Sequence, residues 1–161
     1  MSEKSLARRN TARGFTLIEL IVVISIVGIL AATALPRFIS MDRDARIAQV
    51  NSLAASMNSA AELVYGKAKV ATPAVNLALA GQTLAVNYDG ITNVTVDFGY
   101  PAETAAGIDV VLDYNANDWT VATVAATRQF QWKNYANCYA RYNAPAAINT
   151  LPAITTLTTG C

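Results

Sequence analysis

Histidine is absent from this chain of 161 residues, and cysteine occurs only twice. Without histidine, a serine–histidine–aspartate triad and a histidine-ligated metal site are excluded. The two cysteines, Cys138 and Cys161, lie far apart and form no C-x-x-C motif. The sequence also contains no phosphate-binding glycine loop, no cluster of metal ligands and no activated nucleophile. We therefore predict that the protein is not an enzyme and needs no cofactor or metal ion.

Charged residues are also few, at 14%, whereas 53% of the residues are hydrophobic. The formal charge of +1 is unevenly distributed, because the first 14 residues hold four basic side chains and one acidic one. The rest of the chain holds eight basic and ten acidic side chains. This balance provides no basic surface for nucleic acid, so we expect no nucleic-acid partner. The apolar composition instead indicates extensive contacts with lipid or with other protein chains.

The longest apolar run extends from Phe15 to Leu35 and holds a single charged residue, Glu19. Its 21 residues would form a helix of roughly 30 Å, which matches the hydrocarbon core of a bilayer. The basic segment before the run should stay inside the cell, so we expect the chain after it to lie outside the cytoplasm. A plain transmembrane anchor does not explain Glu19, because a carboxylate there costs about 2–3 kcal/mol. The other alternative is a secretory signal peptide, with a cleavage site at Ala32-Thr33-Ala34.

The Gly14-Phe15 junction, followed by Glu19, resembles the N-terminus of type IV prepilins and related pseudopilins. In these families a short basic leader ends in glycine, the mature protein begins with phenylalanine, and its fifth residue is glutamate. The resemblance implies that a prepilin peptidase cuts between Gly14 and Phe15 and then methylates the new amine of Phe15. It also implies that Glu19 neutralises the Phe15 amine of a neighbouring subunit during filament assembly.

The same resemblance implies three parts of the chain. Residues 1–14 are a cleaved leader. Residues 15–36 are a hydrophobic helix, which anchors the precursor in the inner membrane and later forms the filament core. Residues 37–161 are a globular head that carries a C-terminal disulfide loop.

The helical pattern continues beyond the apolar run. Apolar residues recur at spacings of three and four along one face: Val50, Leu53, Met57, Ala60 and Val64. Gly66 is a suitable residue to end the helix. We therefore predict one helix from Phe15 to about Tyr65, apolar on all sides in its first half and amphipathic in its second. A helix that is apolar on all sides must be buried in lipid or in other protein.

Gly28 and Pro36 interrupt this predicted helix. Glycine costs about 1 kcal/mol in a helix, and proline removes a hydrogen bond and kinks it. Transmembrane helices tolerate both residues, so they need no special explanation. Type IV pilins have glycine and proline at matching positions, however, and the resemblance implies that the segment between them can lose helical order in the filament.

Strand-like and turn-like stretches alternate after residue 82. The candidate strands are Thr83–Tyr88, Ile91–Phe98, Ile108–Tyr114, Trp119–Val124, Phe130–Lys133 and Asn137–Tyr142. Asp89-Gly90 predicts a tight turn, and residues 115–118 predict a hairpin turn. A tail that contains proline and threonine follows. One long helix whose C-terminal half packs on an antiparallel sheet is an α+β fold, and it agrees with the pilin fold.

In an extracytoplasmic chain, Cys138 and Cys161 are most economically a single disulfide, and free thiols are the alternative for a cytoplasmic chain. The bond would close a loop of about 24 residues and contribute roughly 3 kcal/mol. Pilins similar to this chain carry such a bridge near the C-terminus.

One short motif has the opening spacing of a calcium loop, Asp113-x-Asn115-x-Asn117. Asp118 and Val124 stand where that loop requires glycine and glutamate, so a turn explains the motif better than calcium does.

A group of aromatic and basic residues follows in the sequence: Arg128, Phe130, Trp132, Lys133, Tyr135, Tyr139, Arg141 and Tyr142. Such a group can stack sugars or single-stranded nucleic acid, but packing within the disulfide-closed region is the favoured interpretation. The acids Asp97, Asp109 and Asp113 alternate along predicted strands, and we expect them on the solvated side of the sheet.

Two stretches, from Leu35 to Arg46 and from Leu63 to Ala68, resemble pilins of the mannose-sensitive hemagglutinin (MSHA) type, as does the terminal Thr-Gly-Cys. This implies the major subunit of a type IV pilus that attaches cells to surfaces. An assembly ATPase and a platform protein would move the subunits from the membrane into the filament. The alternatives are a pseudopilin of the type II secretion machine and a minor or DNA-uptake pilin. Major pseudopilins often carry calcium loops and lack a C-terminal disulfide, which favours the pilin.

Overall fold

Helix α1 (Leu17–Val70) is the longest element of the structure, with 54 residues. The computed structural model describes residues 14–71, 76–88 and 91–161, so most of the leader and the Asp89-Gly90 turn lie outside the described residues. The chain divides into one compact unit that ends at Met41 and a second from Asp42 to Cys161, and α1 belongs to both. The predicted long helix is confirmed, but it runs from Leu17 to Val70 rather than from Phe15 to about Tyr65. Ala68 is fully buried beside Val64, and this packing carries the helix one turn past Gly66.

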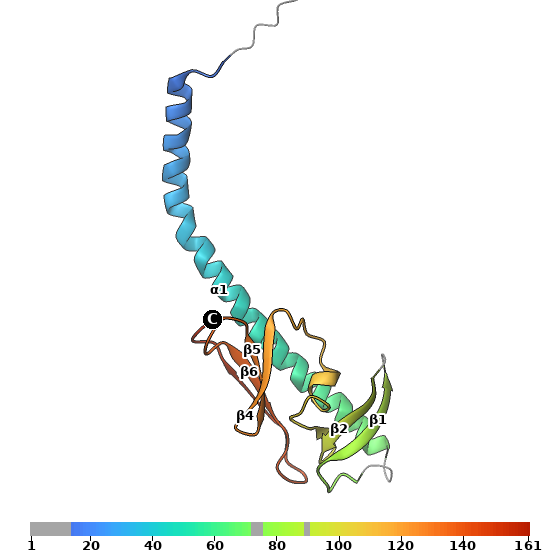
Figure 1. The fold of residues 1–161 in the computed structure, drawn as a ribbon. Coiled ribbons are helices and arrows are strands. Elements are labelled where there is room, and N and C mark those ends of the chain that lie inside the picture. Colours follow the sequence, from blue (N-terminus) through green and yellow to red (C-terminus); the bar gives the residue numbers. More distant parts are fainter. Residues whose placement is uncertain (1–13, 72–75, 89–90) are drawn as a thin grey trace, which may run out of the picture. The chain divides into compact units, whose positions relative to one another are not determined.

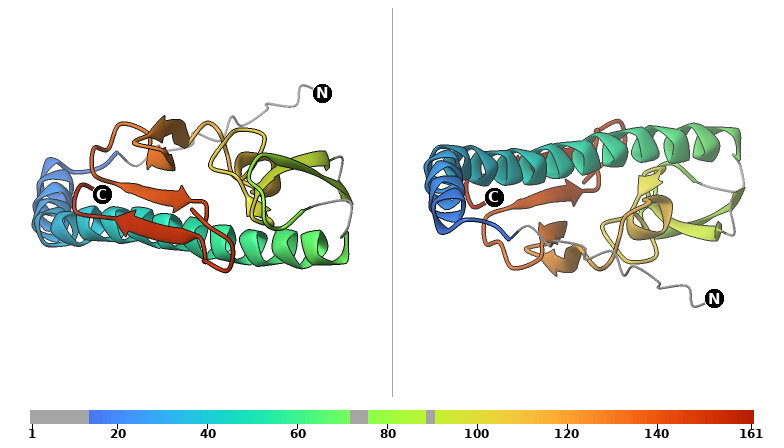
Figure 2. Two further views of the ribbon diagram at one scale, coloured as in Figure 1. Left: turned by 90° about the horizontal axis from the view of Figure 1, so that it is seen from below. Right: turned by 90° about the horizontal axis from the view of Figure 1, so that it is seen from above.

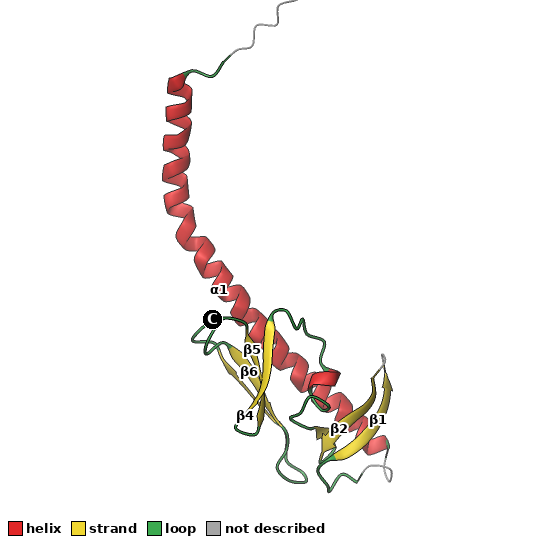
Figure 3. Ribbon diagram, viewed as in Figure 1, coloured by secondary structure: helices red, strands yellow, loops and turns green. Residues whose placement is uncertain are grey.

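Among the described residues, seven strands and one short 3-10 helix accompany α1. Figures 1 and 3 show the long helix and the strands that follow it. They form two antiparallel sheets rather than one. The first has the order β1 (Gln82–Tyr88), β2 (Ile91–Asp97) and β3 (Tyr100–Pro101). The second is a meander of β4 (Trp119–Val124), β5 (Thr127–Trp132), β6 (Tyr139–Asn143) and β7 (Ala153–Leu157). The predicted α+β class, a long helix followed by antiparallel strands, is confirmed.

The two sheets pack successively along one face of the second half of α1, so that the strands lie on one side of it (Figure 2). Val50, Leu53 and Met57 belong to a core that also contains side chains of β4, β5 and β6. Val64 and Ala68, further along the helix, belong to a smaller core with β1 and β2. The predicted apolar face is therefore the buried face, except that Ala61 takes the fully buried place expected for Ala60.

The predicted strand at Ile108–Tyr114 is wrong. This stretch contains the 3-10 helix η1 (Asp109–Val111), and the amide of Val111 donates to the carbonyl of Ile108. Asp109 is not on a solvated face either. Its carboxylate accepts hydrogen bonds from Arg128 Nε at 2.9 Å and from a terminal guanidinium nitrogen of Arg128 at 2.5 Å. A regular strand with Asp109 facing solvent would break this partly buried ion pair.

The predicted disulfide is present between Cys138 and Cys161. Arg46 of α1 donates from Nε to the main-chain oxygen of Cys161 at 2.7 Å, pairs with Asp42, and lies 4.2 Å from the ring centre of Tyr135. Gly160 is required beside the disulfide, because a Cβ there would lie 1.7 Å from the carbonyl oxygen of Ala136. One arginine thus ties the disulfide loop to the helix.

Tyr142 is fully buried at the centre of the larger core, and its hydroxyl donates to the carbonyl oxygen of Pro101 at 2.7 Å. Burial raises the pKa of Tyr142 far above its usual range, and the carboxylates of Glu103 and Asp97 act in the same direction. Tyrosine in the unfolded chain ionises at about pH 10. Above that pH the unfolded state loses a proton that the folded state keeps, so stability falls as the pH rises.

We expect Tyr142→Phe to lower the free energy of unfolding by about 1 kcal/mol at neutral pH, since one buried hydrogen bond is lost. Between pH 10 and 11, the wild type should lose about 1 kcal/mol more than the variant, because only half of the unfolded chains have lost this proton at pH 10. Urea unfolding of the full-length protein in detergent, at a series of pH values, measures both effects. Burial also raises the pKa of Tyr100 and Tyr114, but these residues are present in both proteins and cancel in the comparison. Parallel pH curves would contradict the assignment to Tyr142.

Candidate functional site

The first half of α1 presents apolar side chains on every side. The exposed fraction of its large apolar side chains up to Leu30 runs from 45% at Ile21 to 75% at Leu17, and Phe15 is 89% exposed. The window Leu17–Ala34 has a mean hydropathy of 2.6, and none of it is buried. By length and composition this segment can cross a membrane. A helical surface of this kind needs lipid or protein around it.

Thr16 and Glu19 close the start of the helix by reciprocal hydrogen bonds. Glu19 Oε2 accepts from the amide of Thr16 at 3.1 Å and from its hydroxyl at 3.0 Å. The amide of Glu19 donates to Thr16 Oγ1 at 3.3 Å. This is a capping box, which satisfies backbone amides that a helix otherwise leaves without partners. The Thr-x-x-Glu signal before an apolar run is visible in the sequence and is sufficient to predict this cap.

Gly14 and Gly28 lie in open surroundings. A Cβ added at Gly14 or at Gly28 would meet no atom within 4 Å, so packing within the chain requires glycine at neither position. The backbone of α1 is helical through both Gly28 and Pro36. The structure therefore places Gly14, Phe15 and Glu19 together at one end of the apolar helix, and Gly28 and Pro36 within it.

The head contains the residues of the rejected calcium motif in a turn. Asn115 Oδ1 accepts from the amide of Asn117 at 3.0 Å, and the carbonyl of Asn115 accepts from the amide of Asp118 at 3.0 Å. Within residues 14–71, 76–88 and 91–161, no three His, Cys, Asp or Glu side chains are grouped so that they could hold a metal ion. The predicted turn is present, although it joins η1 to β4 rather than linking two strands.

The aromatic and basic residues of the second sheet do not form a common stacking surface. Phe130 and Tyr142 are fully buried in the core. Arg128 is paired with Asp109, and the guanidinium of Arg141 lies 4.4 Å from the ring centre of Tyr139. The ion pair raises the pKa of Arg128 above its ordinary value, so its charge is held in place. Packing, rather than base stacking, accounts for most of this group.

Comparison with known proteins decides the family. The family described as the prokaryotic N-terminal methylation motif matches residues 9–35. The fimbrial protein EcpC of Eikenella corrodens is 30% identical over 138 residues, which cover 83% of this chain and 89% of that relative. Fimbrial protein Q of Moraxella bovis is 36% identical over 119 residues, with 67% and 73% covered. The chain belongs to the type IV pilin family.

A third relative matches over a shorter stretch. The narrow pilus major component PilA5 of Thermus thermophilus is 48% identical over 58 residues, which are 36% of this pilin and 50% of that relative. No solved structure matches. Type IV pilins are structural subunits rather than enzymes, and membership implies a filament of many subunits and processing by a prepilin peptidase. The apolar helix accords with a membrane-anchored precursor and a surface pilus.

We expect Thr16→Ala to weaken the start of α1 in this pilin. A capping residue contributes about 1 kcal/mol, so the amide of Glu19 should exchange with solvent about fivefold faster when its acceptor is removed. Amide hydrogen exchange of the full-length chain in detergent micelles measures this, and Thr16→Ser, which keeps the hydroxyl, is the matched control. Equal exchange in wild type and Thr16→Ala would show that the capping box contributes nothing.

Proposed function

We propose that this pilin is the major subunit of an MSHA-type type IV pilus that attaches cells to surfaces. The observation that carries the proposal is the combination of an apolar helix exposed on all sides with a compact unit from Asp42 to Cys161 that contains a disulfide. Such a chain is stable in water only when copies bury their apolar helices against one another. The resemblance of the helix and of the terminal Thr-Gly-Cys to MSHA-type pilins supports the subtype.

In this proposal the prepilin peptidase cuts between Gly14 and Phe15 and methylates the new amine. Phe15 is 89% exposed at the end of the helix, which is accessible to an enzyme at the membrane surface. Until assembly, residues 15–36 hold the precursor in the inner membrane, with the head of residues 37–161 outside the cytoplasm. An ATPase and a platform protein, which this chain does not supply, then transfer subunits into the filament.

Glu19 has two successive partners in the proposed mechanism. Before assembly its carboxylate accepts hydrogen bonds from Thr16. In the filament it neutralises the charged amine of Phe15 on a neighbouring subunit. An uncompensated charge in an apolar environment is strongly unfavourable, so this pairing selects the stagger between neighbouring helices.

Gly28 and Pro36 mark a compliant section of the helix. The open space around Gly28 supports a role outside the packing of the single chain, because no contact of this subunit explains the glycine. Loss of helical order between these residues in the filament would let each head adjust its position while the apolar helices remain packed.

We expect Glu19→Ala and Glu19→Gln both to enter the membrane and to be processed, yet to yield few fibres. Glutamine keeps the capping box but has no charge, so the pair separates the local role from the pairing with Phe15. Quantifying sheared fibres against the processed subunit in the membrane measures assembly. Normal fibre yield from Glu19→Gln would contradict the charge-pairing role and leave only the cap.

Deletion of this protein should abolish a different activity under each of the three hypotheses: surface attachment, type II secretion or DNA uptake. Electron microscopy of sheared surface fibres, with mass spectrometry of their main band, should show abundant fibres of a subunit that starts at methylated Phe15. Deletion should remove the fibres and reduce adhesion to surfaces. Absence of the chain from fibres, together with a secretion defect, would favour the type II pseudopilin. Fibres in which the chain is scarce, with loss of DNA uptake, would favour the minor pilin.

A further inference from the structure

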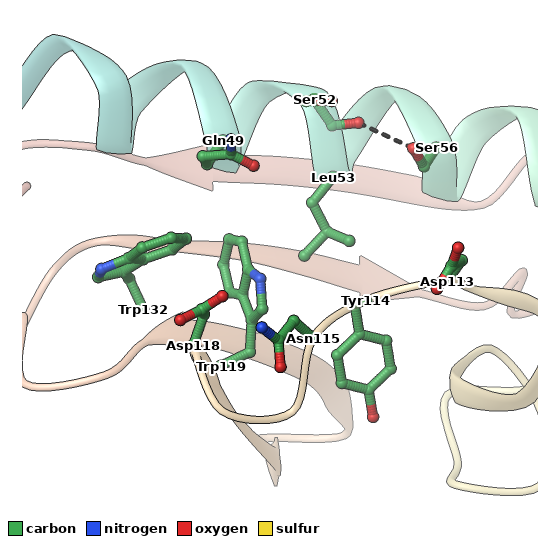
Figure 4. A pocket seen from close by; sticks show the side chains of 10 residues that line it. All are labelled: Gln49, Ser52, Leu53, Ser56, Asp113, Tyr114, Asn115, Asp118, Trp119 and Trp132. Carbon is green, nitrogen blue, oxygen red and sulfur yellow. Dashed lines mark hydrogen bonds between the residues drawn. The ribbon is translucent and has the colours of Figure 1, made fainter.

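A cleft of about 240 Å³ lies in the head between α1 and the segment that leads into β4 (Figure 4). Ligand sites usually begin at about 300 Å³, so this cleft can take one small ring rather than a longer ligand. The side chains from α1 are Gln49, Ser52, Leu53 and Ser56. Those opposite are Asp113, Tyr114, Asn115, Asp118, Trp119 and Trp132. The pilin assembly described above uses none of these side chains.

Two carboxylates of the cleft are uncommitted. Within the described part of the chain, Asp42 and Asp109 form ion pairs, whereas Asp113 and Asp118 pair with no cation and accept no side-chain hydrogen bond. Asp118 is nevertheless well fixed, because its amide donates to Asn115 and its carbonyl accepts from the amide of Lys133 at 2.9 Å. The backbone thus holds a carboxylate at the cleft without using it.

Two indole rings form the firm wall of the cleft. Trp119 and Trp132 are directly paired across β4 and β5, and their rings meet edge to face with centres 5.0 Å apart. Trp119 is only 7% exposed and belongs to the core, while Trp132 is partly exposed beside it. Because the sheet fixes both rings, the cleft has an aromatic wall that loses little conformational entropy on binding a ligand.

This lining indicates the chemistry of the ligand. An indole attracts both the C–H face of a sugar ring and a cation. Free carboxylates form charge-assisted hydrogen bonds with ammonium groups, and the amide and hydroxyl side chains from α1 can bond sugar hydroxyls. None of the ten lining residues is lysine or arginine, so an anionic sugar would find no cation to pair with and would be repelled by the two carboxylates. We propose that this cleft binds an amino sugar carrying a free ammonium group.

Use of this cleft in attachment rests on the proposed function, but binding itself does not. The cleft lies entirely within the second compact unit, so an unassembled subunit should already bind. A lysine side chain of another subunit offers the same charge without the ring. Binding that depends on charge alone would therefore identify the cleft as a contact between subunits instead.

Tryptophan fluorescence reports on this cleft directly, because the chain has two tryptophans and both line it. Full-length pilin in detergent micelles is titrated with D-glucosamine, D-glucose, D-glucuronic acid and lysine at mildly acidic pH. We expect a saturable change with glucosamine, binding at least about tenfold weaker with glucose and with lysine, and none with glucuronic acid. Asp118→Asn should weaken glucosamine binding about tenfold. The exposed Asp44→Asn, which removes a carboxylate of α1 that does not line the cleft, is the matched control.

Several results would overturn the proposal: no saturable change with glucosamine, equal binding of lysine, or an equal loss in both variants. Unchanged unfolding midpoints show that the variants remain folded.

Titration of sheared fibres then separates the binding proposal from the proposed function in attachment. Binding by micellar subunits but not by fibres would mean that the cleft is covered in the pilus and serves no attachment. Failure of the chain to form fibres would reject the pilus role and leave the micelle result intact.

Discussion

Apolar surface that has no partner within its own chain is the constraint on which this pilin depends. Each 100 Å² of such surface removed from water contributes about 2.5 kcal/mol, so the exposed helix from Leu17 to Ala34 favours any environment that covers it. The same helix supplies one buried face to two sheets further along the chain. A single element therefore takes lipid, other subunits and its own head as partners in different places. What this surface requires is an apolar covering, not a particular partner shape. A glycine or a proline in the segment leaves that requirement unchanged.

The polar contacts of the molecule concentrate where this helix begins and where the head meets it. Thr16 and Glu19 satisfy the first amides of α1, and Arg46 joins the helix to the disulfide loop through Cys161 and Tyr135. Asp109 and Arg128 form a partly buried pair between η1 and β5. These contacts contribute less free energy than apolar burial does, but they determine which faces of the elements meet. The free carboxylates of Asp113 and Asp118 lie outside this network.

The sequence was most informative where a periodic pattern met a strong local signal. The apolar face of α1 was predicted correctly from its spacing of three and four, and the strand Trp119–Val124 from the turn signal that precedes it. The start of β5 at Thr127 was missed, since the turn at Ala125 and Ala126 adopts positive φ without glycine or asparagine. Strand β7 was missed, and its burial pattern shows no regular alternation of more and less exposed side chains. Tertiary packing likewise makes part of Ile108–Tyr114 a 3-10 helix instead of the predicted strand. The cleft was not predictable, because its lining residues come from segments far apart in the sequence.

The contact between Arg46 and Cys161 spans 115 residues of sequence. A head closed by so distant a pair cannot be completed from the early part of the chain alone. Until β7 and Cys161 arrive, β6 has an unpaired edge and the arginine lacks its acceptor. Non-local closure of this kind slows folding and prolongs the time in which open strand edges can meet other chains. The head therefore reaches its final fold, and Cys138 finds its disulfide partner, only once the residues up to Cys161 are in place.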